Sequence, residues 1–483
     1  MWRWNTISLP RNMEPRSIHF LAQACGGQLV NCRRDLEFSA VSSDSRRIAK
    51  GVLFWALSGD RFDGHDFVAG AIEAGAAAAV VAQSKMASLP KNLPLISVAD
   101  TRVALGKFAA RYRQDFSPVT IGVAGSNGKT SVKDLIFSVL KEKFDAICSE
   151  ASFNNDIGVP QTLLRIESNH RAAVLELGTN HPGELAPLIG MVQPKIGVIT
   201  SIGREHLEFF GDIAGVAKEE GTLAEMLPGN GLLVINGDSP EVKSIIHRAK
   251  CRVLKVGAGE NCDWRVEALG SSEEGTRFRL TAPDANWSGE WSVALLGRHH
   301  ALNAALAIVV GKELEVGRAE VQRGLSNCRP AKMRMQIDRA HGVTILNDAY
   351  NANADSMVAA LRTLAEFPSR GRRIAVLGDM AELGESASAA HREVGSLAGE
   401  LGLDHVIAIG RNSIWTADCA RAAGAGNASA FLDFNMAALA IQRLVQPEDV
   451  VLVKASRSAK LERVVDALRS ASPSFGNGAA LAA

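Results

Sequence analysis

Residues 120–136 read Thr120-Ile-Gly-Val-Ala-Gly-Ser-Asn-Gly-Lys-Thr-Ser-Val-Lys-Asp-Leu-Ile136. An apolar strand runs into spaced glycines, which are followed by a Lys-Thr pair and an amphipathic helix. Glycines let the backbone approach phosphate oxygens, and a helix N-terminus presents unpaired N–H groups to anionic charge. The lysine can reach terminal phosphates, and the threonine hydroxyl can bind Mg²⁺. The stretch predicts a nucleoside triphosphate site made of Gly125, Ser126, Asn127, Gly128, Lys129, Thr130 and Ser131.

The spacing of these glycines departs from the general phosphate-binding pattern G-x-x-x-x-G-K-[ST], because position 123 is Val and the preceding glycine is Gly122. A glycine-rich turn without any ligand is the alternative interpretation. The ordered succession of strand, glycines, Lys-Thr pair and helix favours the phosphate site.

Composition excludes several classes of protein. The net charge is +1 with 22% charged residues, so bulk attraction does not favour nucleic acid. The seven cysteines are scattered without a C-x-x-C pair, which is typical of a reducing cytoplasm. The N-terminus lacks a continuous apolar signal segment, and no run of 18 apolar residues occurs. We therefore expect a cytoplasmic protein that binds no nucleic acid and does not insert into membranes.

The chain of 483 residues is long enough for about three domains. Proline-containing breaks at 115–118 and 328–332 separate stretches of alternating strand and helix patterns. Apolar runs such as 172–177, 196–202 and 231–235 are typical of buried parallel strands. The predicted fold class is α/β, with an N-terminal α/β domain over 1–117, a central P-loop domain with a parallel sheet over 118–328, a Rossmann-like C-terminal domain over 329–470 and a flexible tail over 471–483.

Two further patterns refine this prediction. Residues 277–280 and 291–296 alternate polar and apolar side chains, which predicts an antiparallel edge of the central domain, and a helix is expected over 301–310. In the last segment the predicted strands are 344–347, 373–377, 405–409 and 450–453.

Glu176 lies at the end of the apolar run 172–177, and His206 follows the next run, 196–202. The carboxyl ends of parallel strands open onto the ligand crevice of such a sheet, where Glu176 could hold the Mg²⁺ of a nucleotide and His206 could be a second ligand. Alone, a strand-end glutamate is more often solvated or capping, and a lone histidine is more often on the surface or packed. Their place after the phosphate-binding strand favours function.

Six motifs together carry a resemblance to the Mur ligase family over about residues 35–470. They are Gly125-Ser-Asn-Gly-Lys-Thr130, Asn154-Asn-Asp-Ile-Gly-Val-Pro160, Glu176-Leu-Gly-Thr-Asn-His-Pro-Gly183, Glu205-His-Leu-Glu208, Asn347-Asp-Ala-Tyr-Asn-Ala-Asn353 and Leu377-Gly-Asp-Met-Ala-Glu-Leu-Gly384.

The resemblance implies an ATP- and Mg²⁺-dependent ligase of peptidoglycan precursor synthesis. It implies that D-alanyl-D-alanine is joined to UDP-N-acetylmuramoyl-tripeptide through an acyl phosphate, by a protein that is a monomer. Phosphoryl transfer needs positioned phosphates and cations rather than a covalent side-chain nucleophile, and the residues fit that requirement.

The resemblance also implies roles for single residues. The catalytic group would be Lys129, Glu176, His206 and Glu220, and the metal ligands would be Thr130, Glu176 and His206. Outside the glycine-rich loop, the nucleotide would contact Asn303, Arg334 and Asp348. The substrates would contact Ser45, Arg46, Asn154, Asn155, Asn180, His181, Asn351, Ser456 and Arg457, the uridine nucleotide lying on the N-terminal domain.

Three positions depart from the family pattern. Glu220 stands where many members have a carbamylated lysine, and we expect its carboxylate to supply that negative charge directly. An exposed helical glutamate beside an impaired site is the alternative. His300 replaces an asparagine in the adenine segment, and Ala455 replaces a glycine.

Two rival functions remain at this point. A folylpolyglutamate synthetase-like ligase would share the core but lack uridine-type loops, and a UDP-binding assay would separate it. A catalytically silent binding protein is conceivable because of Glu220, His300 and Ala455, whereas Lys129 and Thr130 argue against it.

Overall fold

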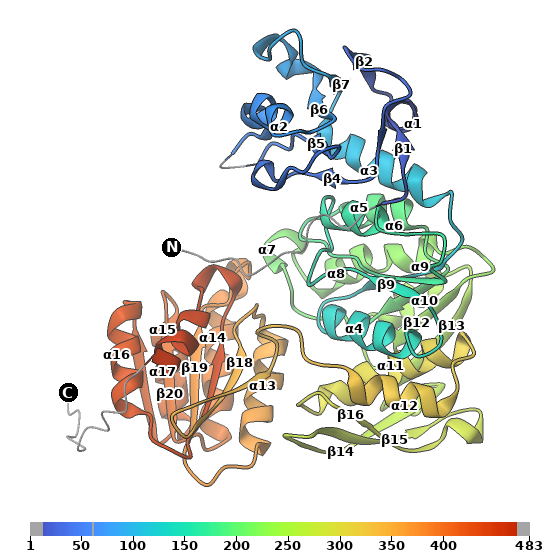
Figure 1. Cartoon of the computed structure of the whole chain (residues 1–483). Helices are drawn as coiled ribbons and strands as arrows, with labels where there is room; N and C mark the ends of the chain where they lie inside the picture. Colours follow the sequence, from blue (N-terminus) through green and yellow to red (C-terminus); the bar gives the residue numbers. More distant parts are fainter. Residues whose placement is uncertain (1–12, 60–61, 471–483) are drawn as a thin grey trace. The chain divides into compact units, whose positions relative to one another are not determined.

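The computed structural model describes residues 13–59 and 62–470, so the predicted tail lies outside the described residues (Figure 1). The chain is mixed α/β, as predicted, and divides into two compact units. One unit comprises the described residues up to 122 together with 144–178 and 186–195. The other comprises 123–143, 179–185 and 196–470. Over the described ranges, every helix is too short or too polar to cross a membrane.

The N-terminal segment forms a five-stranded sheet whose core includes an aromatic stack. The ring of Trp55 lies 5.9 Å from that of Phe108, and its Nε1–H donates to the Thr101 carbonyl over 2.8 Å. The strands β4 to β7 run parallel, and β2 is antiparallel. Their order is β2 (Gln28–Val30), β7 (Leu95–Val98), β6 (Ala78–Ala82), β5 (Leu53–Trp55) and β4 (Val41–Ser42).

Other elements of this segment are a short strand pair and three helices. They are β1 (Arg16–Ser17) with β3 (Glu37–Phe38), and α1 (Ile18–Cys25), α2 (Val68–Glu73) and α3 (Thr101–Arg113).

A nine-stranded sheet carries the phosphate-binding stretch at the end of one strand. Its last three strands are antiparallel, which confirms the predicted antiparallel edge. The strand predicted over 196–202 ends early, at Ile199, and the next two hydroxyls, of Thr200 and Ser201, donate to the Asn127 carbonyl over 2.6 and 3.2 Å. The order is β16 (Gly289–Val293), β15 (Gly275–Thr281), β14 (Trp264–Ser272), β13 (Arg252–Gly257), β12 (Leu232–Asn236), β11 (Ile196–Ile199), β8 (Val119–Ala124), β10 (Ala172–Glu176) and β9 (Ala146–Cys148).

The helices of this region include the predicted one over 301–310, which is longer at both ends. Buried alanines and β-branched residues lie on all sides of α11, so the helix is buried along most of its length. The helices are α4 (Lys129–Leu140), α5 (Gly158–Leu163), α6 (Leu185–Val192), α7 (Leu207–Phe210), α8 (Ile213–Glu220), α9 (Thr222–Met226), α10 (Val242–Arg248), α11 (His299–Glu313) and α12 (Arg318–Asn327).

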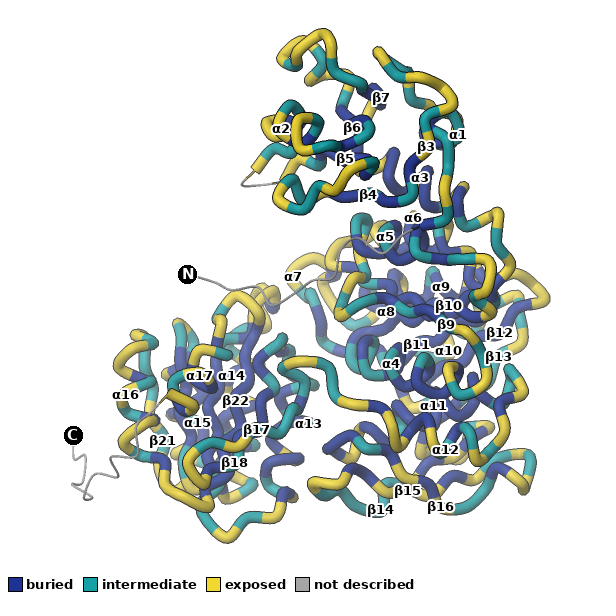
Figure 2. The backbone as a smooth tube through the Cα atoms, viewed as in Figure 1, coloured by how far each residue is buried: buried dark blue, intermediate teal, exposed yellow. Residues whose placement is uncertain are grey.

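The C-terminal segment forms a six-stranded sheet that is parallel except at one edge strand. Its inner strands are mostly buried (Figure 2). A cluster around Leu361 and Val394 covers one face of the sheet, and a cluster around Ile441 and Val464 covers the other. The order is β17 (Gln336–Ala340), β18 (Val343–Asp348), β22 (Val450–Lys454), β19 (Arg373–Gly378), β20 (His405–Ile409) and β21 (Asn427–Phe431).

Strand order in this sheet reverses between β19 and β22, and ligands of such sheets bind beyond the carboxyl ends at that point. The covering helices are α13 (Ala354–Glu366), α14 (Ala387–Glu400), α15 (Ser413–Ala422), α16 (Phe434–Leu444) and α17 (Glu462–Ser470). The three large sheets fall within 28–98, 119–293 and 336–454, inside the three predicted domains, whose boundaries stay a prediction.

Candidate active site

The glycine-rich loop lies between β8 and α4 and is shaped by two glycines with positive φ. Gly125 has φ +112° and Gly128 has φ +88°, and Gly128 begins α4 without a side chain to cap it. The first N–H groups of α4 are therefore not covered by a capping side chain, which suits an anion. Thr130 is buried in the first turn, and Ser131 beside it is partly exposed.

Lys129 folds back over the loop that precedes it. Its ammonium group donates to the Gly125 carbonyl and, over 3.3 Å, to the Ser126 carbonyl. It also lies 3.3 Å from Oε2 of Glu205, whose side chain is only 6% exposed. The cation is thus held where loop N–H groups and α4 begin, as a phosphate-binding lysine requires.

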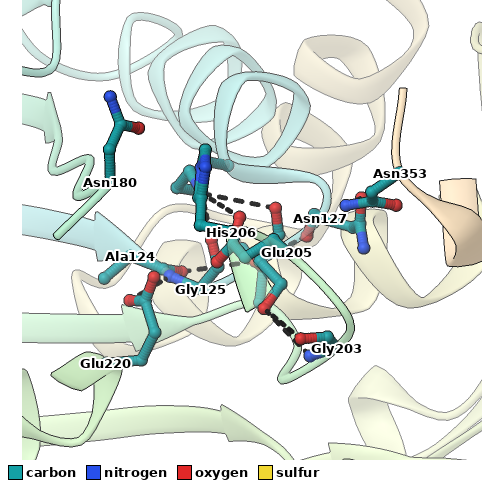
Figure 3. Close-up of polar contacts among 12 residues, drawn as sticks. Ala124, Gly125, Asn127, Asn180, Gly203, Glu205, His206, Glu220 and Asn353 are labelled. Atoms are coloured by element: carbon teal, nitrogen blue, oxygen red, sulfur yellow. Dashed lines mark hydrogen bonds and ion pairs between the residues drawn. The ribbon is translucent and has the colours of Figure 1, made fainter. Parts of the chain in front are cut away.

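Glu220 lies at the end of α8 with its side chain directed at the same loop (Figure 3). Its Oε2 accepts the Gly125 N–H over 2.7 Å, and the residue is 1% exposed. Burial raises the pKa of Glu220 to about 8, with Lys129 lowering that pKa and Glu205 raising it. The structure therefore contradicts the alternative of an exposed helical glutamate at this position.

Gly125 is the loop position with the least room. A Cβ there would lie 2.6 Å from Thr200 Oγ1 and 2.8 Å from the Ser201 carbonyl. We predict that Gly125→Ala weakens nucleotide binding at least about tenfold and lowers the free energy of unfolding by about 1–3 kcal/mol.

The control is Gly183→Ala, which has φ +89° but open space around its Cβ position. It shares the backbone strain without the clash, so it should change stability alone, by about 1 kcal/mol. Calorimetric ATP titration and thermal unfolding measure both effects, and equal nucleotide affinities in the two variants would contradict the prediction.

Glu176 ends β10 and is held by an amide. Asn154 Nδ2 donates to Oε1 of Glu176 over 2.9 Å, and the Ser149 hydroxyl accepts the Glu176 N–H. The neighbouring Asn155 has another task, since its side chain accepts the N–H groups of Ile157 and Gly158 at the start of α5. Asn154 therefore positions the predicted metal ligand.

The His206 ring contacts a carboxylate and an aromatic ring. The Nδ1–H donates to the Glu382 carboxylate, and the ring packs edge-on against Phe210 at 6.4 Å. This hydrogen bond lowers the pKa of Glu382, which is therefore ionised. The preceding Arg204 is bonded to Asp355 and Glu393.

Two acidic side chains each have an oxygen that suits Mg²⁺. Oε2 of Glu176 and Oε1 of Glu205 are buried and accept no hydrogen bond from the described residues, and an orphaned carboxylate oxygen of this kind fits a cation. Over 13–59 and 62–470, no group of three or more His, Cys, Asp or Glu side chains could hold a metal. Mg²⁺ commonly takes one or two carboxylates and completes its shell with phosphates and water.

Asn303 lies on α11 directly against the glycine-rich loop. A Cβ at Gly128 would come within 2.9 Å of its Oδ1. Its Nδ2–H donates to Nδ1 of His300 over 3.2 Å. Burial lowers the pKa of His300 well below its usual value, so the ring is neutral and one ring nitrogen can accept this hydrogen bond. His300 thus orients Asn303.

The C-terminal candidates gather at the carboxyl ends of β18 and β22. Lys454 Nζ is 2.6 Å from Oδ2 of Asp348 and donates to the Asn351 carbonyl over 3.0 Å. The Arg334 guanidinium stacks over the Tyr350 ring at 4.2 Å.

Two further C-terminal candidates follow β22. The Ser456 hydroxyl donates to the Ala352 carbonyl and accepts the Ala381 N–H. Arg457 pairs with Glu462 over 2.9 Å and is half exposed, so its guanidinium is accessible to a carboxylate.

The remaining candidates lie on surface loops. Asn180 and His181 both donate their N–H groups to Glu184, and the His181 ring lies 4.2 Å from that of Phe209. Arg46 is bonded to Asp44.

Several contact residues had been missed from the sequence. Glu205 and Glu382 lie within motifs of the family resemblance but were not predicted as site residues, and Lys454 carried no periodic signal. Glu219 fixes the loop before α6 by accepting the Gly183 and Leu185 N–H groups over 2.8 and 2.9 Å. A charged residue directly after the predicted strand 450–453 was the available signal for Lys454, whereas Glu205 lies three residues beyond the predicted strand 196–202.

The fold and the loop define a family. Family models match residues 37–113 (Mur ligase family, catalytic domain), 123–311 (Mur ligase middle domain) and 333–457 (Mur ligase, glutamate ligase domain). The chain belongs to the Mur ligase family.

Individual relatives show which members of the family the chain is similar to. The chain is 37% identical over 445 residues to the UDP-N-acetylmuramoyl-tripeptide–D-alanyl-D-alanine ligase of Escherichia coli K12, covering 90% of this chain and 94% of the relative. A crystal structure of MurF from Acinetobacter baumannii superposes with a TM-score of 0.86 at 29% identity, covering 95% of this chain and all of the other. MurF ligase from Thermotoga maritima in complex with ADP gives a TM-score of 0.77 at 27% identity, covering 89% and 96% of the two chains.

Proposed function

We infer that this chain is an ATP-dependent ligase that joins D-alanyl-D-alanine to UDP-N-acetylmuramoyl-tripeptide in peptidoglycan precursor synthesis. The observation that carries this function is the glycine-rich loop with Lys129 folded over it, in a chain related over nine-tenths of its length to ligases of that name. The tripeptide carboxylate attacks the γ-phosphorus of ATP, which forms an acyl phosphate and releases ADP. The dipeptide amine then attacks the acyl carbon, phosphate leaves, and the amine nitrogen loses a proton as the amide forms.

The chain's own residues account for binding and orientation. The N–H groups at the start of α4 and the Lys129 ammonium bind phosphate oxygens, while Asn303 contacts the base. Arg334 and Asp348 contribute from the C-terminal segment, and the cation–π contact with Tyr350 limits the rotamers of Arg334.

Thr130, Glu176 and His206 are the proposed metal ligands. Mg²⁺, when bound, neutralises charge on the phosphates during transfer. The orphaned Oε2 of Glu176 supports its assignment, and Asn154 holds that carboxylate in place.

The substrate residues stay part of the proposal. Arg457 is placed to pair with the dipeptide carboxylate, with Ser456 and Asn351 beside it, because an accessible guanidinium binds a carboxylate bidentately. The tripeptide substrate is assigned to Ser45, Arg46, Asn154, Asn155, Asn180 and His181.

We also propose that the enzyme is a monomer and works in the cytoplasm. The seven cysteines lie among the described residues and form no disulfide there, which fits a reducing compartment that supplies ATP.

Phosphate release by the purified chain tests this function. With ATP, Mg²⁺ and UDP-N-acetylmuramoyl-tripeptide, we expect release that depends on added D-alanyl-D-alanine, and mass spectrometry should show the joined product. Release with a folate and glutamate in their place, or no release with any acceptor, would contradict the proposal and favour one of the two rival functions.

A further inference from the structure

The loop after β11, residues 203–208, is attached to the C-terminal segment by side chains and backbone. Arg204 donates five hydrogen bonds to Asp355 and Glu393, at 2.5 to 3.0 Å. A Cβ at Gly203 would lie 2.5 Å from Oδ2 of Asp355, so the chains approach closely here. These contacts fix the backbone of the loop, but they do not determine the orientation of the His206 ring.

The ring of His206 meets a carboxylate that arrives from the turn after β19. His206 and Glu382 both have left-handed backbone conformations, with φ of +49° and +60°. The Glu208 N–H donates to the Glu382 carbonyl over 3.2 Å, and a Cβ at Gly384 would meet Glu208 Cα at 3.3 Å. Two uncommon backbone conformations thus face each other, and this places the Glu382 carboxylate on Nδ1 of the ring.

This contact has a chemical consequence for the imidazole. A neutral histidine carries its proton on one ring nitrogen, and the other nitrogen keeps a lone pair. The Glu382 carboxylate lies on Nδ1 and accepts its hydrogen bond, so the proton stays there and the lone pair stays on Nε2. Nε2 forms no hydrogen bond with any described residue. Histidines that bind metals commonly have their other ring N–H held by a carboxylate in this way.

We propose that Glu382 is a positioning residue that fixes the Nδ1–H tautomer and the ring orientation of His206, and so directs Nε2 to the cation of the nucleotide. The proposal rests on the function proposed above, in which His206 is a metal ligand. It makes the C-terminal segment a contributor to the cation site through His206.

The tautomer can be measured in the ligand-free protein, without any activity. In long-range ¹H–¹⁵N spectra of the ¹⁵N-histidine-labelled chain at pH 8, the His206 signals are assigned by their loss in His206→Gln. We expect the Nδ1–H tautomer in the wild-type chain and a predominantly Nε2–H ring in Glu382→Ala, because the Nε2–H form is favoured in the absence of a partner. An Nε2–H tautomer in the wild-type chain, or no change in Glu382→Ala, would overturn the proposal.

The matched control is Glu393→Ala. Glu393 has the same exposure as Glu382, 44% against 43%, and is also bonded to the loop, but through Arg204. Glu393→Ala should leave the His206 tautomer unchanged. If it changed the tautomer as much as Glu382→Ala does, the change would come from any loosening of the loop rather than from loss of the Glu382 carboxylate. Glu382→Gln offers Nδ1 both a donor and an acceptor, so it should populate the Nδ1–H tautomer less than the wild-type chain does.

A kinetic test follows where the ligase assay succeeds. Glu382→Ala should raise the Mg²⁺ concentration for half-maximal rate about 10- to 100-fold, with a smaller change in kcat at saturating Mg²⁺. An unchanged Mg²⁺ requirement would overturn the proposal. The NMR result stands independently of this assay, so failure of the ligase function and failure of this proposal are distinguishable.

Discussion

Lys129→Ala is expected to lower the rate of dipeptide-dependent phosphate release by about 10²- to 10³-fold, which is the usual loss when one preorganised charged donor is removed from a transferring group. The lysine is already held over the glycine-rich loop by the Gly125 and Ser126 carbonyls and by Glu205. It therefore needs little reorganisation when phosphate arrives. Steady-state phosphate release at saturating ATP measures the effect on kcat.

Two variants make the interpretation specific. Lys129→Arg keeps the charge with a different shape and should recover only part of the rate, because the guanidinium is planar and bulkier. Lys141→Ala, at the exposed end of the same helix, should leave the rate within twofold. If Lys129→Ala kept more than a tenth of the wild-type rate with intact folding, the loop would not be the site of phosphoryl transfer.

Much of the fold could be predicted from local patterns in the sequence. The run 172–177 became β10, and 450–453 became β22, because continuous apolar residues are stable in a parallel sheet covered on both faces. The run 196–202 was predicted too long. Its last residues are apolar or small, but Thr200 and Ser201 bond the glycine-rich loop through Ala124 and Asn127 instead of continuing the strand.

The contacts within the candidate site were predictable only in part. Glycines, Lys129 and Thr130 form a local motif, so their sequence order carries the geometry. Glu382 lies 176 residues from its partner His206, and Asn353 lies 226 residues from Asn127, to which it donates over 3.0 Å (Figure 3). Such pairs depend on the packing of separate elements, which no periodicity encodes.

In assays above about pH 8, where the Glu220 carboxylate is ionised in the folded chain, Glu220→Gln is expected to lower the ligase rate at least about tenfold, because the amide retains the shape but cannot become anionic. The Gly125 N–H can still find an acceptor in the glutamine side chain, so the loop should keep its conformation. Unchanged turnover in this variant would falsify the idea that the carboxylate supplies charge to the site. The rate should not depend on dissolved CO₂ in either protein.

The same substitution should stabilise the protein in alkaline buffer. Because burial raises the pKa of Glu220 to about 8 from an unfolded value near 4.5, the folded chain holds a proton that the unfolded chain has lost. The associated stability is fully present below pH 4.5 and is lost as the pH rises to about 8. Glutamine does not titrate, so Glu220→Gln should unfold at a higher temperature than the wild type at pH 8, and this difference in unfolding temperature should shrink towards pH 5.

The control Glu225→Gln removes a carboxylate that is exposed and paired with Arg248, and it should show no such difference. Thermal unfolding across this pH range measures the effect, and parallel curves for wild type and Glu220→Gln would mean that Glu220 is ionised in the folded protein throughout.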